Sequence, residues 1–305
     1  MQPIHAYSYP DILSISERIE WTVDGVLPQG ESFDFDKPFL PEALAATQTL
    51  DFLNEREQRV LNQIRGNAYL SIFGLVEEFV LPFVLDHARP LLGGDDHRVR
   101  ALLGFAAEEA KHIHLFHRFR SEFERGFGTH CEVIGPPQEI ARAVLAHHPL
   151  GVALAILHIE WMTQRHYLES VHDRGDLDPH FVSLLKHHWM EEAQHSKIDT
   201  LMVEALADGR EPADIEKAFD DYLAIGGLID GGLKKQVEFD LDAFARATGR
   251  RLGSEEYERA FAVQRRSNRW TYLGSGMTHA NFLATLERIS PSSRARLEQL
   301  APAFC

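Results

Sequence analysis

The sequence predicts an all-α protein built around a bundle of four long helices. Between residues 67 and 207, apolar side chains recur three and four positions apart, the period of an α-helix with one buried face. No stretch of the chain shows the sustained apolar–polar alternation of a strand. Clusters of Gly, Pro and Asp separate the periodic segments, as expected of loops between helices.

The composition is that of a soluble globular protein, with 305 residues, 44% hydrophobic and 25% charged. A net charge of −15 argues against non-specific nucleic-acid binding, which requires a basic surface. The sequence contains no run of 18 or more apolar residues, so no membrane helix is predicted. Residues 1–7 do not resemble a signal peptide. Cys131 and Cys305 are too few for a disulfide framework, so we expect a reducing cytoplasm.

Residues 1–305 are expected to form one domain, in which residues 1–60 are an N-terminal arm and cover. Up to residue 45 this segment is rich in Pro, Asp and aromatic residues and has no sustained period, which predicts an irregular arm. Thr47 or Asp51 is the expected cap of a first helix, marked by Leu50, Leu53, Leu61 and Ile64.

The bundle core is expected at residues 61–207. Its first long helix should run from Asn67 to about His87, with a kink near Pro82, and end in the turn residues 89–96. The second should span about 96–125, followed by segments at 138–147 and 150–171. The last should span 180–207, closed by Gly209 and Pro212.

Residues 208–305 are expected to form a C-terminal helical extension packed on the bundle. The helical segments are 213–248, 254–273 and 277–289. Gly226-Gly227 and Gly231-Gly232 are candidate breaks in the first of them, because glycine weakens a helix interior.

Each of the four bundle helices places a carboxylate among apolar residues. His188, Glu192 and His195 form one row on the last helix, because residues three and four apart share a face. The second helix repeats Glu-x-x-His as Glu109 and His112. Glu160 lies on the third helix, and Glu77, preferred over Glu78 for its wider apolar stripe, lies on the first.

Buried carboxylates and imidazoles need compensation, and metal ions supply it. One Glu from each of two helices and a Glu-x-x-His from each of the other two is the ligand pattern of ferritin-like di-metal proteins. The sequence therefore predicts a ferritin-like four-helix bundle with additional N- and C-terminal helices. Oxygen and imidazole donors without thiolate favour iron or manganese. The predicted metal ligands are Glu77, Glu109, His112, Glu160, His188, Glu192 and His195.

His188 completes the motif His-x-x-x-Glu-x-x-His, and here the sequence resembles the p-aminobenzoate N-oxygenase family of ferritin-like di-iron enzymes. The matching stretches are 188–195, 108–112, the mid-helix Glu160 and, loosely, 77–80. The resemblance covers roughly residues 60–207 and implies four Glu and three His ligands, with His188 as the third histidine. Substrate identity does not carry over with it.

The resemblance implies an O2-dependent di-iron oxygenase that acts through a peroxo-di-iron(III) intermediate and oxidises an arylamine-like substrate at nitrogen. Two iron ions are expected, with a Mn/Fe pair as the alternative, and O2 is the co-substrate. Electrons should come from an external reductase or ferredoxin-like donor, since the chain has no nucleotide-binding fingerprint. The resemblance also suggests a homodimer; nucleic acid and membrane are not expected partners.

Three other functions remain open from the sequence. The same site is compatible with oxidation of C–H bonds of an aliphatic substrate, or with iron handling as a ferroxidase, which the length of the chain disfavours. A metal-free helical interaction module is the third. No catalytic residue is predicted beyond the metal ligands.

Several further residues are candidates for supporting roles near the site. Asp199 is a candidate to orient ligand imidazoles, and Arg165 to pair with a substrate carboxylate, although an exposed Arg165 is the more common outcome. Bulky residues near the site should shape an apolar pocket: Phe73, Phe105, Trp161, Met162 and Trp189. The remaining histidines are expected to be surface or supporting residues: His114, His117, His147, His148, His158, His166 and His187.

Overall fold

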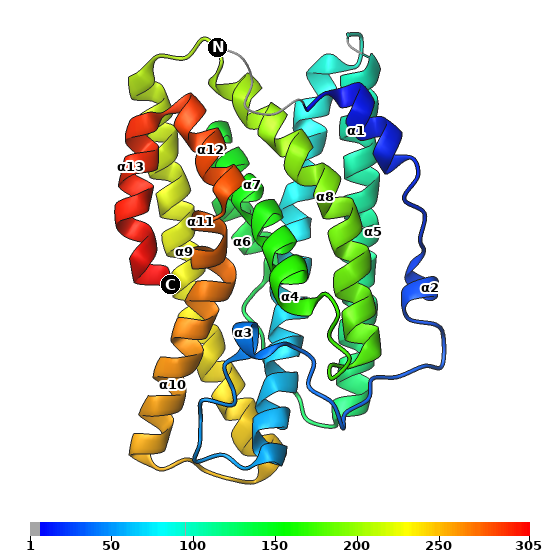
Figure 1. Ribbon diagram of the computed structural model, residues 1–305, viewed down its shortest axis with the longest axis vertical. Coiled ribbons are helices and arrows are strands. Elements are labelled where there is room, and N and C mark those ends of the chain that lie inside the picture. Colours follow the sequence, from blue (N-terminus) through cyan, green and yellow to red (C-terminus); the bar gives the residue numbers. More distant parts are fainter. Residues whose placement is uncertain (1–6, 95) are drawn as a thin grey trace.

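The computed structural model describes residues 7–94 and 96–305, and its elements are helices joined by turns, without a strand among those residues. The start of the expected arm, residues 1–6, and Asp95 of the expected turn lie outside the described residues. Four long helices form the centre of the molecule (Figure 1): α4 (Glu55–Ala88), α5 (Asp96–Phe127), α7 (Pro149–Arg165) and α8 (Pro179–Ala207). The predicted all-α class, a four-helix bundle with additional helices before and after it, is confirmed.

Local sequence signals mark the starts of α4, α7 and α8. Asn54 and Glu57 form a reciprocal capping box at the start of α4, which satisfies two backbone N–H groups. Asp178 caps α8 by accepting a hydrogen bond from the Phe181 N–H at 2.7 Å, and Pro179 stands at the first helical position. Pro149 occupies the same position in α7.

The first helix is longer than predicted. α4 begins after Asn54 and runs without interruption to Ala88, so the short helix expected from Thr47 or Asp51 merges into it. Thr47 is buried and its hydroxyl donates to the Glu42 carboxylate at 2.7 Å, which leaves it no capping role. Pro82 lies inside the helix. The expected domain boundary at residue 60 falls within α4, and the division of the chain stays a prediction.

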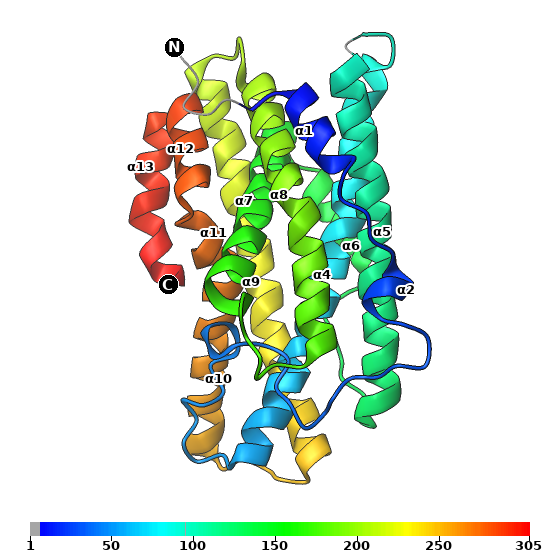
Figure 2. The same cartoon turned by 45° about the vertical axis from the view of Figure 1, so that its right-hand side comes forward.

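The N-terminal arm crosses the outer face of the bundle formed by α5 and α8 (Figure 2). It contains short helices rather than being irregular throughout: α1 (Tyr9–Ser16), α2 (Val23–Val26) and α3 (Glu42–Ala45). The Asp178 side chain that caps α8 also accepts a hydrogen bond from the Asp34 N–H at 2.7 Å. One carboxylate therefore both starts α8 and ties the arm to it.

The C-terminal segment packs on the side of α4 and α7, with α12 and α13 furthest from α5 (Figure 1). Its elements are α9 (Pro212–Thr248), α10 (Ser254–Arg269), the π-helical turn η3 (Trp270–Gly274), α11 (Ser275–Met277), α12 (Ala280–Ile289), α13 (Pro291–Leu300) and the 3-10 turn η4 (Ala301–Phe304). The last helix, α13, was not predicted.

α9 continues through both candidate breaks, Gly226-Gly227 and Gly231-Gly232, so the expected break is wrong. The helix packs along α4 and α7, and this burial outweighs the roughly 1 kcal/mol that each interior glycine costs relative to alanine. The contact with α7 is close at Gly151, where a Cβ atom would lie 2.6 Å from the Ala218 carbonyl oxygen.

Shorter elements complete the chain. The 3-10 turn η1 (Arg89–Leu91) follows α4, α6 (Pro137–Leu145) packs against α4 and α7, and the π-helical turn η2 (His166–Val171) extends α7. Both Cys131 and Cys305 are free thiols.

One helical stretch among the described residues, Glu55–Leu91, is long and apolar enough to cross a membrane by length and composition. In the structure 72% of its apolar window is buried inside the protein. The core helix of a bundle has the same character, so this is weak evidence for a membrane span. That no segment crosses a membrane stays a prediction.

Candidate metal centre

The seven predicted ligand residues lie together in the interior of the bundle. Glu77 comes from α4, Glu109 and His112 from α5, Glu160 from α7, and the last three from α8. All seven side chains are buried: Glu77, Glu109, His112, Glu160, His188, Glu192 and His195. We call them the seven-residue cluster.

Ligand atoms of the cluster fall into two overlapping groups, and within each group they lie within 4.8 Å of one another. The first is Glu77, His112, His188 and Glu192, and the second is Glu109, His112, Glu192 and His195. His112 and Glu192 belong to both groups. Glu160 belongs to neither, but it is buried near Glu192, and burial and the charge of Glu192 raise its pKa. Two adjoining centres with shared residues are what a pair of metal ions requires.

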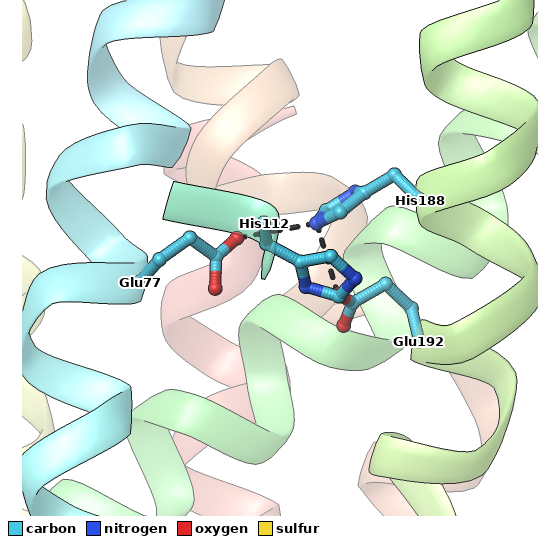
Figure 3. Close-up of side chains that lie close together, drawn as sticks. All are labelled: Glu77, His112, His188 and Glu192. Atoms are coloured by element: carbon cyan, nitrogen blue, oxygen red, sulfur yellow. Dashed lines mark hydrogen bonds and ion pairs between the residues drawn. The ribbon is translucent and has the colours of Figure 1, made fainter. Parts of the chain in front are cut away.

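His188 joins the first and last bundle helices across the first group (Figure 3). Its Nε2 lies 3.2 Å from Glu77 Oε1 and 2.9 Å from Glu192 Oε1. The ring stands edge-on to Phe73 and Phe116, with centroid separations of 5.7 and 5.0 Å. The extra histidine of the fourth helix therefore faces the cluster and is packed in place by aromatic rings.

The first-helix carboxylate that joins the cluster is Glu77. The neighbouring Glu78 is only partly buried, and its Oε1 lies 3.8 Å from Nε2 of His117, a residue outside the cluster. The two residues differ by about 100° around α4, so only one of them can face the other bundle helices. The geometry selects Glu77 over Glu78.

The two Glu-x-x-His histidines turn the same nitrogen toward the cluster. His112 Nδ1 lies 3.1 Å from Glu192 Oε1, and His195 Nδ1 lies 2.9 Å from Glu109 Oε1. Both Nδ1 atoms are buried and lack a partner in hydrogen-bonding geometry. Both oxygens of Glu109 and one each of Glu160 and Glu192 are in the same condition. Unpaired buried donors and acceptors are costly, and a cation at their centre satisfies them, so these residues fit a metal pair.

The Nε2 atom of each of these histidines forms a hydrogen bond with a carboxylate on the other of the two helices, α5 and α8. His112 Nε2 on α5 donates to Glu191 Oε2 on α8 at 2.9 Å, and His195 Nε2 on α8 donates to Glu108 Oε2 on α5 at 2.7 Å. Each carboxylate directly precedes a cluster glutamate in sequence. The motif is thus Glu-Glu-x-x-His on both helices, and its first acid orients the histidine of the other copy.

Further contacts fix these two outer carboxylates. Lys111 donates to Glu191, and the Ser16 hydroxyl of the arm donates to Glu108 Oε1 at 2.5 Å. The Ser16 and His195 hydrogen bonds lower the pKa of Glu108, although burial opposes the shift. Trp21 of the arm lies parallel to the His112 ring at 6.1 Å, and Lys111 Nζ lies 4.0 Å from the Trp21 ring centre.

Asp199, the residue considered for orienting ligand imidazoles, makes no hydrogen bond to any of them. Asp199 is buried, but neither of its oxygens has a hydrogen-bond partner, and burial raises its pKa well above the usual range. Glu108 and Glu191 take that role instead. The sequence does show a second glutamate before the ligand glutamate in each motif, Glu108 and Glu191. Which histidine each of them contacts, however, depends on how α5 packs against α8.

The pKa values of the buried carboxyl groups in the cluster shift in opposite directions. Burial, followed by the charge of Glu109, raises the pKa of Glu77 well above its usual range. Burial alone would raise the pKa of Glu109 as well, but the adjacent Glu77, His112 and His195 side chains outweigh it and hold that pKa at about 2. Burial and Glu192 raise the pKa of Glu160 in the same way. Two divalent cations would balance the negative charge of four ionised carboxylates.

The other candidate residues are placed as follows. Phe105 stacks on His195 at 4.0 Å, whereas Trp161 stacks on His279 and Trp189 on Tyr167. Phe73 and Met162 line a cavity described below. Arg165 is neither exposed nor free for a substrate, because it donates to the Ser275 carbonyl and to Thr278 Oγ1 at 2.8 Å.

Two histidines predicted as surface or supporting residues are instead core residues. His158 accepts from the Tyr222 hydroxyl at 2.9 Å and donates to the Tyr272 carbonyl at 3.3 Å. His166 accepts from the Tyr69 hydroxyl at 3.1 Å and donates to the Thr271 carbonyl at 2.9 Å. Burial lowers the pKa of His158 to about 4 and that of His166 to about 3, so both are neutral.

No family model and no curated protein matches the chain. Among solved structures, it is similar to an R2-like ligand-binding oxidase with an aerobically reconstituted Mn/Fe cofactor, at 13% identity and a TM-score of 0.43, covering 86% of this chain and 93% of that one. A mutant of an R2-like ligand-binding oxidase with an anaerobically reconstituted Mn/Fe cofactor gives 13% identity and a TM-score of 0.44, covering 88% and 93%. A likeness this distant does not bear on the chemistry of the site.

Proposed function

We propose that this protein is an O2-dependent, non-haem di-iron oxidoreductase of the ferritin-like kind. The observation that supports it best is the seven-residue cluster, in which buried carboxylates and imidazoles from four helices converge and six of the seven residues hold a buried polar atom without a hydrogen-bond partner. Four Glu and three His ligands supply the charge and donor types that two iron ions need. A Mn/Fe pair has the same donor preferences and is the alternative.

The leading reaction is N-oxygenation of an arylamine-like substrate, as the motif His-x-x-x-Glu-x-x-His suggests. One atom of O2 enters the N–H bond and the other leaves as water, and an external reductase or ferredoxin-like donor supplies two electrons with two protons from solvent. The bound metals would supply the reduction of O2. The chain itself orients His112 and His195 through Glu191 and Glu108, and buries the site away from water.

Oxidation of a C–H bond is the second candidate reaction. An apolar cavity borders the cluster beside Phe73, and such a cavity suits a hydrocarbon as well as an amine. It also disfavours the ferroxidase alternative, because iron handling needs no organic pocket. A homodimer and a cytoplasmic location stay predictions.

Metal analysis joined to O2 reactivity tests the proposal. Purified protein reconstituted with Fe(II) should hold about two iron ions per chain and consume O2 when reduced. Glu192→Ala should lose both ions, since Glu192 belongs to both ligand groups, whereas Glu78→Ala should keep them. A wild-type protein that binds no iron or manganese, or equal metal contents in the two variants, would overturn the proposal.

Product analysis separates the two reactions. With an arylamine panel and a chemical reductant, N-oxygenation gives a hydroxylamine that contains one oxygen atom from 18O2. Labelled alcohol from an apolar hydrocarbon, with no labelled hydroxylamine, would favour the C–H reaction.

A further inference from the structure

An apolar cavity of about 260 Å³ lies between α4, α6, α7 and α9, and one of its lining residues, Phe73, contacts His188 of the seven-residue cluster. Phe73 lines it from α4, one helical turn before Glu77, and the same ring stands edge-on to His188. On α7, Ile159 and Met162 line it on either side of Glu160 in the sequence. The cavity and the cluster therefore share a wall.

The volume indicates the size of a fitting ligand. An engineered apolar cavity of about 150 Å³ in another protein takes up benzene. By that measure 260 Å³ accommodates a fused bicyclic ring or a chain of roughly ten carbon atoms. Val76, Ile140 and Leu233 supply aliphatic surface on three sides, so the ligand's gain on binding comes from burying apolar area.

The charges around the cavity indicate which ligands it rejects. Among its lining residues the single charged side chain is Glu139, an exposed carboxylate on α6, and none is Lys, Arg or His. A carboxylate ligand would enter past a like charge and be buried without a cation to pair with. Arg165 does not line the cavity, because its guanidinium is held by Ser275 and Thr278.

We propose that this cavity binds the organic substrate, and that the substrate is an uncharged or amine-bearing apolar molecule of about ten carbon atoms rather than an anionic one. The substrate role rests on the proposed function, whereas the binding selectivity rests on the cavity alone. Glu139 excludes anions and attracts a protonated amine at the entrance, and the apolar walls hold the carbon skeleton beside Phe73.

Matched ligands test the selectivity without any turnover. 1-Naphthylamine, 1-naphthol and 1-naphthoate share one ring system, and at neutral pH only the carboxylate carries a charge. Dissociation constants are measured by calorimetry on the full chain, both metal-free and reconstituted. The amine and the alcohol should bind at least tenfold more tightly than the carboxylate in both forms. Equal affinity for the carboxylate would overturn the proposal.

Cavity-filling variants test the location. Ala143→Trp on α6 projects an indole into the cavity and should weaken naphthylamine binding at least tenfold. Ala146→Trp, at the exposed end of the same helix, is the matched control and should leave binding unchanged. Gly232→Leu fills the cavity from α9 and serves if the first variant misfolds. Glu139→Gln should reduce the ratio between the dissociation constants of 1-naphthoate and 1-naphthylamine. Binding that no filling variant changes would overturn the assignment.

Metal content and O2 uptake on the same preparations separate this inference from the proposed function. If the protein binds naphthylamine more tightly than naphthoate but holds no metal, the proposed function is wrong and the inferred selectivity of the cavity stands. Protein that holds two iron ions but binds the three ligands equally overturns only the cavity inference.

Discussion

Glu191 provides the sharpest test of how the metal centre is organised. Its carboxylate is buried, accepts the His112 Nε2 hydrogen at 2.9 Å and also contacts Lys111. Glu191→Gln retains an oxygen that can accept this hydrogen bond but removes the negative charge that makes His112 a stronger ligand. Glu191→Leu removes both. Partners of this kind typically contribute 10- to 100-fold to metal affinity.

We therefore expect Glu191→Gln to weaken metal binding about tenfold and Glu191→Leu closer to a hundredfold, or about 1.4 and 2.8 kcal/mol. Glu108→Gln removes the corresponding charge behind His195 and should behave like Glu191→Gln. Competition with a chelator of known affinity measures the loss, and Glu78→Gln, a half-buried carboxylate outside the cluster, is the control. If the metal affinities of both Glu191 variants stay within twofold of that of the control, the hydrogen bonds between Glu191 and His112 and between Glu108 and His195 do not support metal binding.

Three further predictions concern the third histidine, pH and packing. His188→Ala should reduce the iron content from about two to about one per chain, because His188 belongs to one ligand group only; unchanged content would exclude it as a ligand. Burial lowers the pKa of His158 to about 4. Below pH 6.5, His158 is therefore protonated in the unfolded chain but stays neutral in the folded chain until the pH approaches 4. Stability should thus fall by about 2 kcal/mol from pH 6.5 to pH 5 through this group, and denaturant unfolding of His158→Gln should show a loss smaller by that amount. Gly151→Ala on α7 should cost about 1–3 kcal/mol, because its Cβ would meet the Ala218 carbonyl of α9 at 2.6 Å. Gly227→Ala on α9 meets nothing within 4 Å and should not destabilise the fold; equal unfolding midpoints of the two variants would contradict this.

Predictions that depended on helical periodicity agree with the structure. The spacing of His188, Glu192 and His195 places them on one face of α8, and all three are buried. The same holds for Glu109 and His112 on α5. Periodicity also favoured Glu77 over Glu78, through the wider apolar stripe that accompanies Glu77, and the structure brings Glu77 into the cluster.

Predictions that depended on local helix breakers were less successful. The glycine pairs in α9 did not interrupt it, because contacts with α4 and α7 offset their weak helix propensity. The buried states of His158 and His166 were also missed. Their partners, Tyr222, Thr271 and Tyr272, are remote in sequence, so no local pattern indicated them.

The sequence by itself determined which side of each helix holds the carboxylates and imidazoles, because the α-helical period sets the angle between neighbouring residues. Only the tertiary structure decided that Glu191 meets His112, that Glu108 meets His195, and that α6 and α9 leave an apolar cavity beside Phe73. These features depend on the axial offset and rotation of one helix against another. Many packed side chains set those two quantities together, and no short motif encodes them.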